Sequence, residues 1–422
     1  MKVTHMKHKL LKISIIQILL TLAINSSYSQ LYDGWRGVSR SGIYNEAGLL
    51  KSWPSSGPAV LWETEDAGTG FSSPTVTDDA VYITGKKGEN DVLTAYSQDG
   101  KKKWETAYGK ASDSNYPDSR CTPVVSGDRI FVVSGQGDMV CITRDGKISW
   151  SINYFDKYKA PHPRFGISES PIVADNKVIG IPGGNSAAAV AFNVESGKVI
   201  WETPSVNEET QYVNPLVIDY NGQKLLITVT TASILGINVN DGKLQWKINY
   251  ESMNDQQGGR RNHTNTPVFG DGHLLVANGY SQVAVKLKIN QNGPPVIVWR
   301  NKDLTPHVGG SVLLGNLIFS STHDTNSTGR WICVDWITGK TLWINDWHNK
   351  GPIISADGLL YIIEEKSGNV GLVKPSAEKL DVVSTFRIRN GSGPYWAHPA
   401  INNKRLFLRH GEYLAAYSLK SN

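Results

Sequence analysis

The stretch NDGKLQW at 240–246 is the clearest guide to the fold. Three close copies occur elsewhere in the chain: RDGKISW at 144–150, ESGKVIW at 195–201 and ITGKTLW at 337–343. Each copy joins a short polar turn to a tryptophan that follows three residues after the lysine. Asp-Gly and Asn-Gly pairs favour tight hairpins because these residues tolerate the positive φ angles of such turns. The recurring turn therefore predicts an antiparallel β structure made of repeated units.

A second signal marks where each unit begins. A serine, threonine or asparagine precedes a proline that opens an apolar run, as in SSPTVTDDAVYITG at 72–85 and CTPVVSGDRIFVVSG at 121–135. Apolar and polar residues alternate in these runs, which is typical of half-buried strands. On this pattern the units open at Pro74, Pro123, Pro171, Pro215, Pro267, near Ser311, at Pro352 and at Pro399.

Seven tryptophans recur along these units at intervals of 42–53 residues. These repeat tryptophans are Trp62, Trp104, Trp150, Trp201, Trp246, Trp299 and Trp343. A fixed period of this length indicates units that stack or surround an axis, and four short strands per unit predict a β-propeller. We expect each tryptophan to pack between neighbouring sheets as part of the core rather than around a cofactor.

The two ends of the chain complement each other. The last unit ends at EYLAAYSLK without a final turn and tryptophan, while PAVLWET at 58–64 carries Trp62 with no unit before it. We expect this N-terminal strand to join the last unit, because that pairing closes the ring and removes an open sheet edge. The predicted fold is an all-β, eight-bladed propeller spanning 58–422.

The first residues are typical of a targeting segment. Four lysines precede the apolar run ISIIQILLTLAI at 13–24, which is shorter than the roughly 20 residues that a membrane-spanning helix needs. Ser27 and Ser29 stand where a signal peptidase reads small residues, so we predict a secretory signal at 1–29 and a leader at 30–57. An uncleaved anchor stays open. No cysteine lies near the cleavage site to carry a lipid, so we expect a periplasmic or secreted protein with no transmembrane segment in its mature chain.

Charge and cysteine content limit the partners. Removal of 1–29 lowers the formal charge from +5 to +1, which gives no electrostatic reason to expect nucleic acid or an anionic membrane as a partner. The chain is expected to be a monomer. The three cysteines, Cys121, Cys141 and Cys333, are expected to be small buried side chains in strands, while a disulfide between Cys121 and Cys141 stays open.

The repeat resembles that of a known propeller family. The pattern SPxV, DDxVYxxG and DGKxxW is similar to the PQQ-type repeat of quinoprotein-like propellers, and the likeness covers nearly all of the mature chain. The leader at 33–62 and the ending at 396–419 are similar to those of exported bacterial members of this family. The resemblance implies either a quinoprotein dehydrogenase, which holds PQQ and calcium on the axis, or a BamB-like protein, which binds proteins and no quinone.

The residues match neither class in its functional parts. The chain has no adjacent cysteine pair of the kind that the dehydrogenases carry over the quinone, and their calcium ligands cannot be placed on it. It also lacks the lipidated N-terminal cysteine of BamB-like proteins. No cofactor is therefore expected, with PQQ and calcium left open as the alternative.

Candidate ligand-binding residues lie just before the proline of each unit, where a propeller chain enters its innermost strand. They are richer in histidine, arginine and aromatic side chains than the other turns, and convergent groups of this kind at a concave surface favour a ligand site. The candidates are Arg120, His162, Arg164, Tyr212, His263, His307, Tyr395 and Trp396. The alternative is that these side chains bond to neighbouring backbone and plug the channel. No metal site is expected, because no paired His or Cys spacing supports zinc.

The residues leave three functions open. The leading hypothesis is an exported, non-catalytic binding or scaffold protein that presents its funnel face to a protein or a small ligand. The second is a PQQ- and calcium-dependent dehydrogenase of alcohols or sugars. The third, a binder of anions or glycans, fits the arginine and tryptophan content of the funnel. The polar loops at 254–264 and 323–330 are natural places for contact with a partner, but solvated loops without a role are the favoured interpretation of both.

Overall fold

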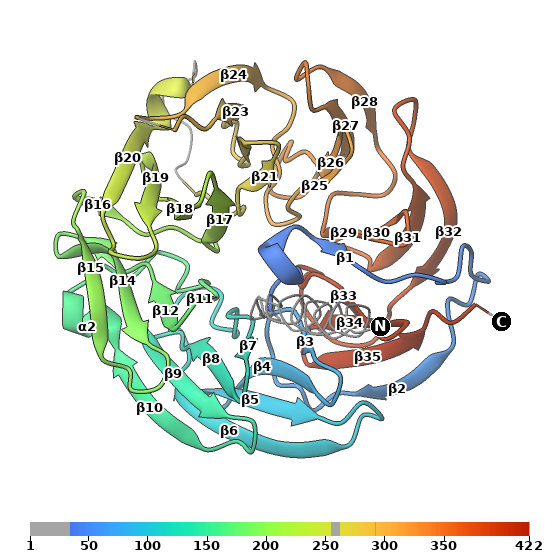
Figure 1. Cartoon of the computed structure of the whole chain (residues 1–422). Coiled ribbons are helices and arrows are strands. Elements are labelled where there is room, and N and C mark those ends of the chain that lie inside the picture. The colour runs from blue at the N-terminus through green and yellow to red at the C-terminus, as the bar shows by residue number, and fades with distance from the viewer. Residues whose placement is uncertain (1–33, 255–261, 292, 422) are drawn as a thin grey trace, which may run out of the picture. The chain divides into compact units, whose positions relative to one another are not determined.

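The structure is a computed structural model that describes residues 34–254, 262–291 and 293–421. The predicted signal segment, the start of the leader and most of the polar loop at 254–264 lie outside these residues. Within them the chain forms eight antiparallel sheets, each with a core of four strands, arranged around a central axis (Figure 1). The predicted eight-bladed propeller is confirmed.

The first four blades follow one another along the chain. Blade 1 consists of β3 (Thr75–Val76), β4 (Val81–Lys87), β5 (Asn90–Tyr96) and β6 (Lys102–Lys110). Blade 2 consists of β7 (Val124–Ser126), β8 (Arg129–Val133), β9 (Asp138–Thr143) and β10 (Ile148–Asn153). Blade 3 consists of β11 (Ile172–Ala174), β12 (Lys177–Gly180), β14 (Ala187–Asn193) and β15 (Val199–Pro204), extended by β13 (Gly183–Gly184) and β16 (Glu208–Glu209). Blade 4 consists of β17 (Leu216–Tyr220), β18 (Gln223–Val229), β19 (Ser233–Asn238) and β20 (Leu244–Asn249).

The last four blades complete the ring. Blade 5 consists of β21 (Val268–Gly270), β22 (His273–Val276), β23 (Ala284–Lys288) and β24 (Val296–Asn301). Blade 6 consists of β25 (Val312–Leu314), β26 (Leu317–Ser321), β27 (Trp331–Asp335) and β28 (Thr341–Asn345). Blade 7 consists of β29 (Ile353–Ala356), β30 (Leu359–Ile363), β31 (Asn369–Lys374) and β32 (Asp381–Arg387), with β1 (Ile43–Tyr44) added in parallel to β29. Blade 8 consists of β33 (Ala400–Asn402), β34 (Arg405–His410), β35 (Tyr413–Ser418) and β2 (Val60–Thr64).

Every innermost strand begins one residue after the position that the sequence marks as the opening of a unit. Thus β3 follows Pro74 and β33 follows Pro399. Even the degenerate sixth unit obeys this rule, because β25 begins directly after Ser311. Helices are few among the described residues: α2 (Tyr154–Tyr158) and the short 3₁₀ segments η1 (Val38–Arg40) and η2 (Glu251–Met253).

The N-terminal strand closes the ring. Strand β2 pairs antiparallel with β35, from Val60 opposite Tyr417 to Thr64 opposite Leu414. Figure 1 shows this junction, where β2 in blue lies beside β35 in red. Both strands thereby gain partners, so the predicted closure of the last blade by the first strand is confirmed.

The repeat tryptophans explain why the turn glycine and the tryptophan recur together. The indole Nε1 of Trp62 donates to the carbonyl oxygen of Gln98 at 3.0 Å, and a Cβ added to Gly100 would lie 2.6 Å from the same ring. The turn glycine of one blade therefore lies on the tryptophan of the preceding blade. The same contact joins Gly146 to Trp104, Gly197 to Trp150, Gly242 to Trp201 and Gly339 to Trp299.

The tryptophans join blades, as predicted, but they are not all fully buried. Trp201, Trp246 and Trp299 are buried. The rings at positions 62, 104, 150 and 343 are half-buried, because the outermost strand of each blade keeps one face toward solvent.

The leader crosses the centre of the ring, where the blue segment next to β1 lies in Figure 1. The Arg40 guanidinium is buried and donates to the carbonyl oxygens of Pro171 at 2.6 Å and Pro215 at 2.7 Å. Arg36 donates to the carbonyl oxygens of Ser311 at 2.5 Å and Ile353 at 2.9 Å. These acceptors begin the innermost strands of four different blades, so two arginines hold the leader in place and link the blades around the axis.

The three cysteines are buried free thiols, and no disulfide joins Cys121 to Cys141. Burial raises the pKa of Cys121 to about 12, which makes its thiol a poor nucleophile. No helix in the part of the chain described here is long and apolar enough to cross a membrane.

Candidate functional site

A cavity of about 620 Å³, which we call the funnel, opens among the segments that lead into the innermost strands. Arg120 precedes blade 2, Ser168 precedes blade 3, Asn214 precedes blade 4 and Thr264 precedes blade 5. The leader contributes Trp35 to the wall. The volume falls within the range of roughly 300–1,000 Å³ that is common for small-molecule sites.

Much of the funnel wall is a continuous band of aromatic rings, which we call the aromatic band. Its members are Phe71, Trp396, Tyr116, Phe165 and Tyr212. In this order, the ring centroids of successive members lie 4.9, 5.6, 6.1 and 6.0 Å apart, and their planes are inclined by 50°, 54°, 64° and 47°. The rings therefore pack against one another as a curved apolar surface, and no successive pair is parallel.

The charged groups of the funnel are cationic. The guanidinium of Arg120 donates to the carbonyl oxygens of Phe165 and Tyr116, and burial lowers its pKa to about 10, so it stays protonated at neutral pH. The Arg164 guanidinium lies 5.3 Å from the centre of the Phe165 ring, and it forms no hydrogen bond or ion pair with the described residues. Among the described residues that line the funnel there is no carboxylate. The described part of the lining is therefore positive, and in it the Arg164 guanidinium is open to a ligand.

Several neutral polar groups in the wall are also open. The carboxamides of Asn115 and Asn262 make no hydrogen bond to the described part of the chain, and neither does the hydroxyl of Tyr116, a residue that is 43% exposed. Unlike most polar groups of a protein wall, these are not engaged in holding the fold together. They are available to a ligand that offers both donors and acceptors.

The structure brings five of the eight sequence-derived candidates to the funnel. Lining residues among them are Arg120, Arg164, Tyr212, His307 and Trp396. They come from blades that are far apart in sequence, and their convergence follows from the shared position before each innermost strand.

The other three candidates lie outside the funnel lining. The His263 ring is buried 5.2 Å from the Tyr250 ring. The Tyr395 ring stacks on His410 at 3.6 Å and its hydroxyl donates to a backbone carbonyl. His162 is exposed, with its ring 5.2 Å from that of Phe155, next to the short helix α2. Adjacent residues of an extended segment point in opposite directions, which takes His263 and Tyr395 into the blades while their neighbours line the funnel.

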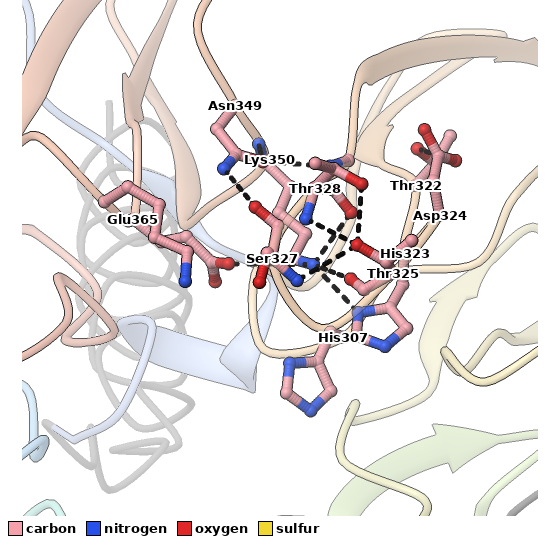
Figure 2. A network of polar contacts seen from close by, with 12 residues as sticks. His307, Thr322, His323, Asp324, Thr325, Ser327, Thr328, Asn349, Lys350 and Glu365 are labelled. Carbon is pink, nitrogen blue, oxygen red and sulfur yellow. Dashed lines mark hydrogen bonds and ion pairs between the residues drawn. The ribbon is translucent and has the colours of Figure 1, made fainter.

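Behind the wall lies a polar network that Figure 2 shows from close by. The Lys350 ammonium is buried and donates to the carbonyl oxygens of Thr325 at 2.6 Å and Thr328 at 3.0 Å. It also lies 3.0 Å from Nδ1 of His323, whose ring lies 4.5 Å from that of His307 in the funnel. Lys350 thus holds the polar loop at 323–330 next to the funnel wall.

The charges in this network follow from its ion pair and its burial. The Lys350 Nζ donates to two carbonyl oxygens, and burial lowers its pKa while the nearby Glu365 carboxylate opposes that shift. Its counter-charge is Glu365, whose Oε1 lies 3.6 Å from the Lys350 Nζ. Burial lowers the pKa of His323 to about 4, so its ring is neutral at neutral pH. Burial next to His323 and Lys350 likewise lowers the pKa of His307 to about 3, so the funnel histidine carries no charge at neutral pH.

Sequence reasoning missed several lining residues. Tyr280, whose hydroxyl lies 3.1 Å from Nε2 of His307, stands in the connection between the second and third strands of blade 5. Trp35 comes from the leader. Tyr116 could have been predicted from the sequence, because it stands four residues before Arg120 in the same segment that leads into blade 2.

The comparisons with known proteins agree with this architecture. A family model described as outer membrane protein assembly factor BamB matches residues 110–345 of the 422. This chain belongs to that family. The matched residues contain all the strands of blades 2 to 6.

Curated relatives of this BamB-family chain come from two classes. A quinoprotein alcohol dehydrogenase, PedH of Pseudomonas putida, is 26% identical over 34% of this chain and 24% of its own length. BamB of Moranella endobia is 22% identical over 58% of this chain and 62% of its own length. The chain thus spans less than two thirds of the length of each of these relatives.

Solved structures share the fold of this BamB-family chain. BamB from Moraxella catarrhalis is similar with a TM-score of 0.63 at 13% identity, over 86% of this chain and 99% of that one. A quinohemoprotein alcohol dehydrogenase from Comamonas testosteroni is similar with a TM-score of 0.69 at 11% identity, over 95% of this chain and 82% of that one. At these identities the similarity concerns the propeller and does not choose between the two classes.

The donor set of the funnel does not fit the calcium ion that the quinoprotein class implies. Calcium takes six to eight oxygen ligands, with carboxylates prominent among them. The described lining has no aspartate or glutamate, and no cluster of three or more His, Cys, Asp or Glu side chains elsewhere in the described residues is placed to hold a metal. Glu365, a buried carboxylate behind the wall, is already engaged by Lys350 and by the Trp396 indole.

Proposed function

We propose that this protein is an exported, non-catalytic binding propeller that presents its funnel face to a small ligand, or to a side chain or terminus of a partner protein. The observation that supports this most is the state of the funnel wall. It combines a curved aromatic surface with a guanidinium and carboxamides that form no hydrogen bond with the described residues. Groups of these kinds converging on a concave surface are typical of a binding site.

The relatives named BamB support a role in binding over one in catalysis. BamB of Moranella endobia is named as an outer membrane protein assembly factor. We extend to this chain only the general role of a propeller that holds other molecules. A mature chain that begins after the signal at 1–29, is located in the periplasm or outside the cell, and works as a monomer belongs to the same proposal.

The second candidate is a quinoprotein dehydrogenase. The quinoprotein alcohol dehydrogenase PedH, 26% identical over 155 residues, is the observation in its favour. The absence of a carboxylate from the described funnel lining argues against it, because nothing there would hold calcium. We therefore place the dehydrogenase second.

A thermal-shift screen tests the proposal. Mature wild-type protein and the Tyr116→Ala variant are screened against a library of metabolites, peptides and saccharides. Tyr116 is half-exposed and its hydroxyl has no hydrogen bond to described residues, but its ring packs against Trp396 and Phe165, so we expect its variant without ligand to fold and to melt only slightly below the wild type. Compounds that raise the melting temperature of the wild type, fail to raise that of the variant and are recovered unchanged would support a binding funnel. A library in which no compound stabilises the wild type would contradict it, as would conversion of the bound compound.

A further inference from the structure

The funnel offers a ligand three kinds of contact. The aromatic band offers apolar faces, Asn115 and Asn262 offer carboxamides, and Arg164 offers a cation. A molecule that satisfies all three has an apolar face, several groups that both donate and accept hydrogen bonds, and a negative charge.

The carboxamides favour a ligand rich in hydroxyl groups. A carboxamide carries an NH₂ donor and a carbonyl acceptor side by side, as a hydroxyl carries both functions on one atom. Asn115, Asn262 and the hydroxyl of Tyr116 are wall groups without hydrogen bonds to described residues, so vicinal hydroxyls of a ligand would meet complementary donors and acceptors. A purely aromatic ligand would leave most of these groups without partners.

The shape of the aromatic band favours a saccharide over a planar ring system. A planar ligand is held best between two parallel faces, but successive rings of the band are inclined by 47° to 64°. Such a curved wall presents one face at a time, which suits the C–H faces of successive sugar rings. The cavity volume of about 620 Å³ leaves room for more than one ring.

The Arg164 guanidinium favours a ligand that carries a carboxylate. Arg164 has a planar guanidinium without other hydrogen bonds, and a guanidinium pairs with a carboxylate through two parallel hydrogen bonds. The other lining arginine, Arg120, is already engaged by two carbonyl oxygens. One open guanidinium in a wall whose described residues include no carboxylate matches a ligand with a single carboxylate at that point.

We infer that the ligand of the funnel is a short acidic saccharide, a chain of sugar rings that carries a carboxylate. Its rings would lie on the aromatic band, its hydroxyls would bond to Asn115 and Asn262, and its carboxylate would bond to Arg164. This inference rests on the proposed function and narrows it to one class of ligand.

Calorimetric titration of the mature protein tests the inference. The probes are trigalacturonic acid, trimannuronic acid and an unsulfated chondroitin disaccharide, with maltotriose as the neutral comparison. We expect at least one acidic probe to bind, and maltotriose to bind at least about tenfold more weakly because it lacks the charge-assisted hydrogen bonds. Arg164→Gln is expected to lower the affinity for the acidic probe at least about tenfold and to leave the affinity for maltotriose unchanged.

A matched variant controls for general loss of charge. Arg300 is exposed on the outer strand β24 and has no partner among the described residues, so Arg300→Gln removes the same charge far from the funnel. Its affinity for the acidic probe should equal that of the wild type. An equal loss in both variants would overturn the inference, because the effect would then be one of net charge.

The outcomes separate this inference from the proposed function. If no acidic saccharide binds while the metabolite screen finds another compound that depends on Tyr116, the ligand class is wrong and the binding role stands. A planar aromatic carboxylate that binds through Arg164 would be such a compound. If no compound of any class stabilises the wild type, both proposals fall.

Discussion

The indole Nε1 of Trp396 donates a hydrogen bond to Oε2 of Glu365 at 3.1 Å, and Oε1 of the same carboxylate lies 3.6 Å from the Lys350 ammonium. Trp396 belongs to the aromatic band, whereas Lys350 holds the loop at 323–330. One buried ion pair therefore fixes both an aromatic ring of the funnel and a loop of its rim.

Loss of either partner of this ion pair should destabilise the protein. Lys350→Met leaves the Glu365 carboxylate buried without its counter-charge, and Glu365→Gln does the same to the ammonium. Breaking a buried pair in this way costs about 3–5 kcal/mol in free energy of unfolding. Denaturant unfolding of the two single variants measures that cost.

The double variant Lys350→Met with Glu365→Gln provides the control. Because it buries no unpaired charge, we expect it to lose clearly less than the sum of the two single losses. Additive losses would show that the two side chains act independently, against the contact in the structure.

The contribution of the contact between turn glycine and tryptophan to stability can be measured by comparing two glycines in similar backbone conformations. Gly242 has a φ of +72° and its added Cβ would lie 2.6 Å from the Trp201 ring, whereas Gly222 has a φ of +74° and open space around that position. Alanine at either site costs about 1–2 kcal/mol of backbone strain. Gly242→Ala should lose roughly 1–3 kcal/mol more than Gly222→Ala, because it also overpacks against the ring.

Equilibrium unfolding of both glycine variants in denaturant gives the comparison. Equal losses for Gly242→Ala and Gly222→Ala would mean that the tryptophan moves aside without cost, and would remove the physical reason for the repeated motif.

A buried acid predicts a pH dependence of stability. Burial raises the pKa of Glu169 from 4.5 to about 8, while the Ile181 amide donates to its carboxyl and Arg40 lies near enough to oppose the shift. Between these two pH values the unfolded chain has released a proton that the folded chain keeps. The contribution of Glu169 to the free energy of unfolding is therefore fully present below pH 4.5 and falls by up to about 1.4 kcal/mol per pH unit as the pH rises toward 8.

Glu169→Gln isolates this effect, since glutamine resembles the protonated acid and can still accept from the Ile181 amide. The variant should gain stability relative to the wild type as the pH rises from about 5 to about 8, measured by unfolding at several pH values. A difference between the two proteins that does not change with pH would show that the carboxyl is ionised throughout.

The fold could be predicted from the sequence because its signals are local. The turn position that lies against a tryptophan ring has no room for a side chain, so it must be a glycine. A proline precedes every innermost strand except that of blade 6, so residues such as Pro74 and Pro399 mark the blade starts to within one residue. The partnership of the strand carrying Trp62 with the last blade followed from counting units. These features depend on residues that are close together in the sequence or on the period of the repeat.

The candidate site was less accessible, because it depends on which way side chains point and on chain segments brought together across the ring. His263 and His307 occupy equivalent places in successive units, yet only His307 lines the funnel. Trp35 reaches the funnel through the leader, whose path is set by the bonds of Arg36 and Arg40 to distant carbonyls. No local pattern encodes such a path.

Whether the funnel is a binding site or a quinoprotein centre can be decided by one titration. Mature protein is titrated calorimetrically with PQQ, once with calcium and once with a calcium chelator. Because the described lining has no carboxylate, we predict that calcium changes neither the heat nor the affinity. Saturable binding of PQQ that requires calcium would contradict the binding role proposed above and would make the dehydrogenase the leading function.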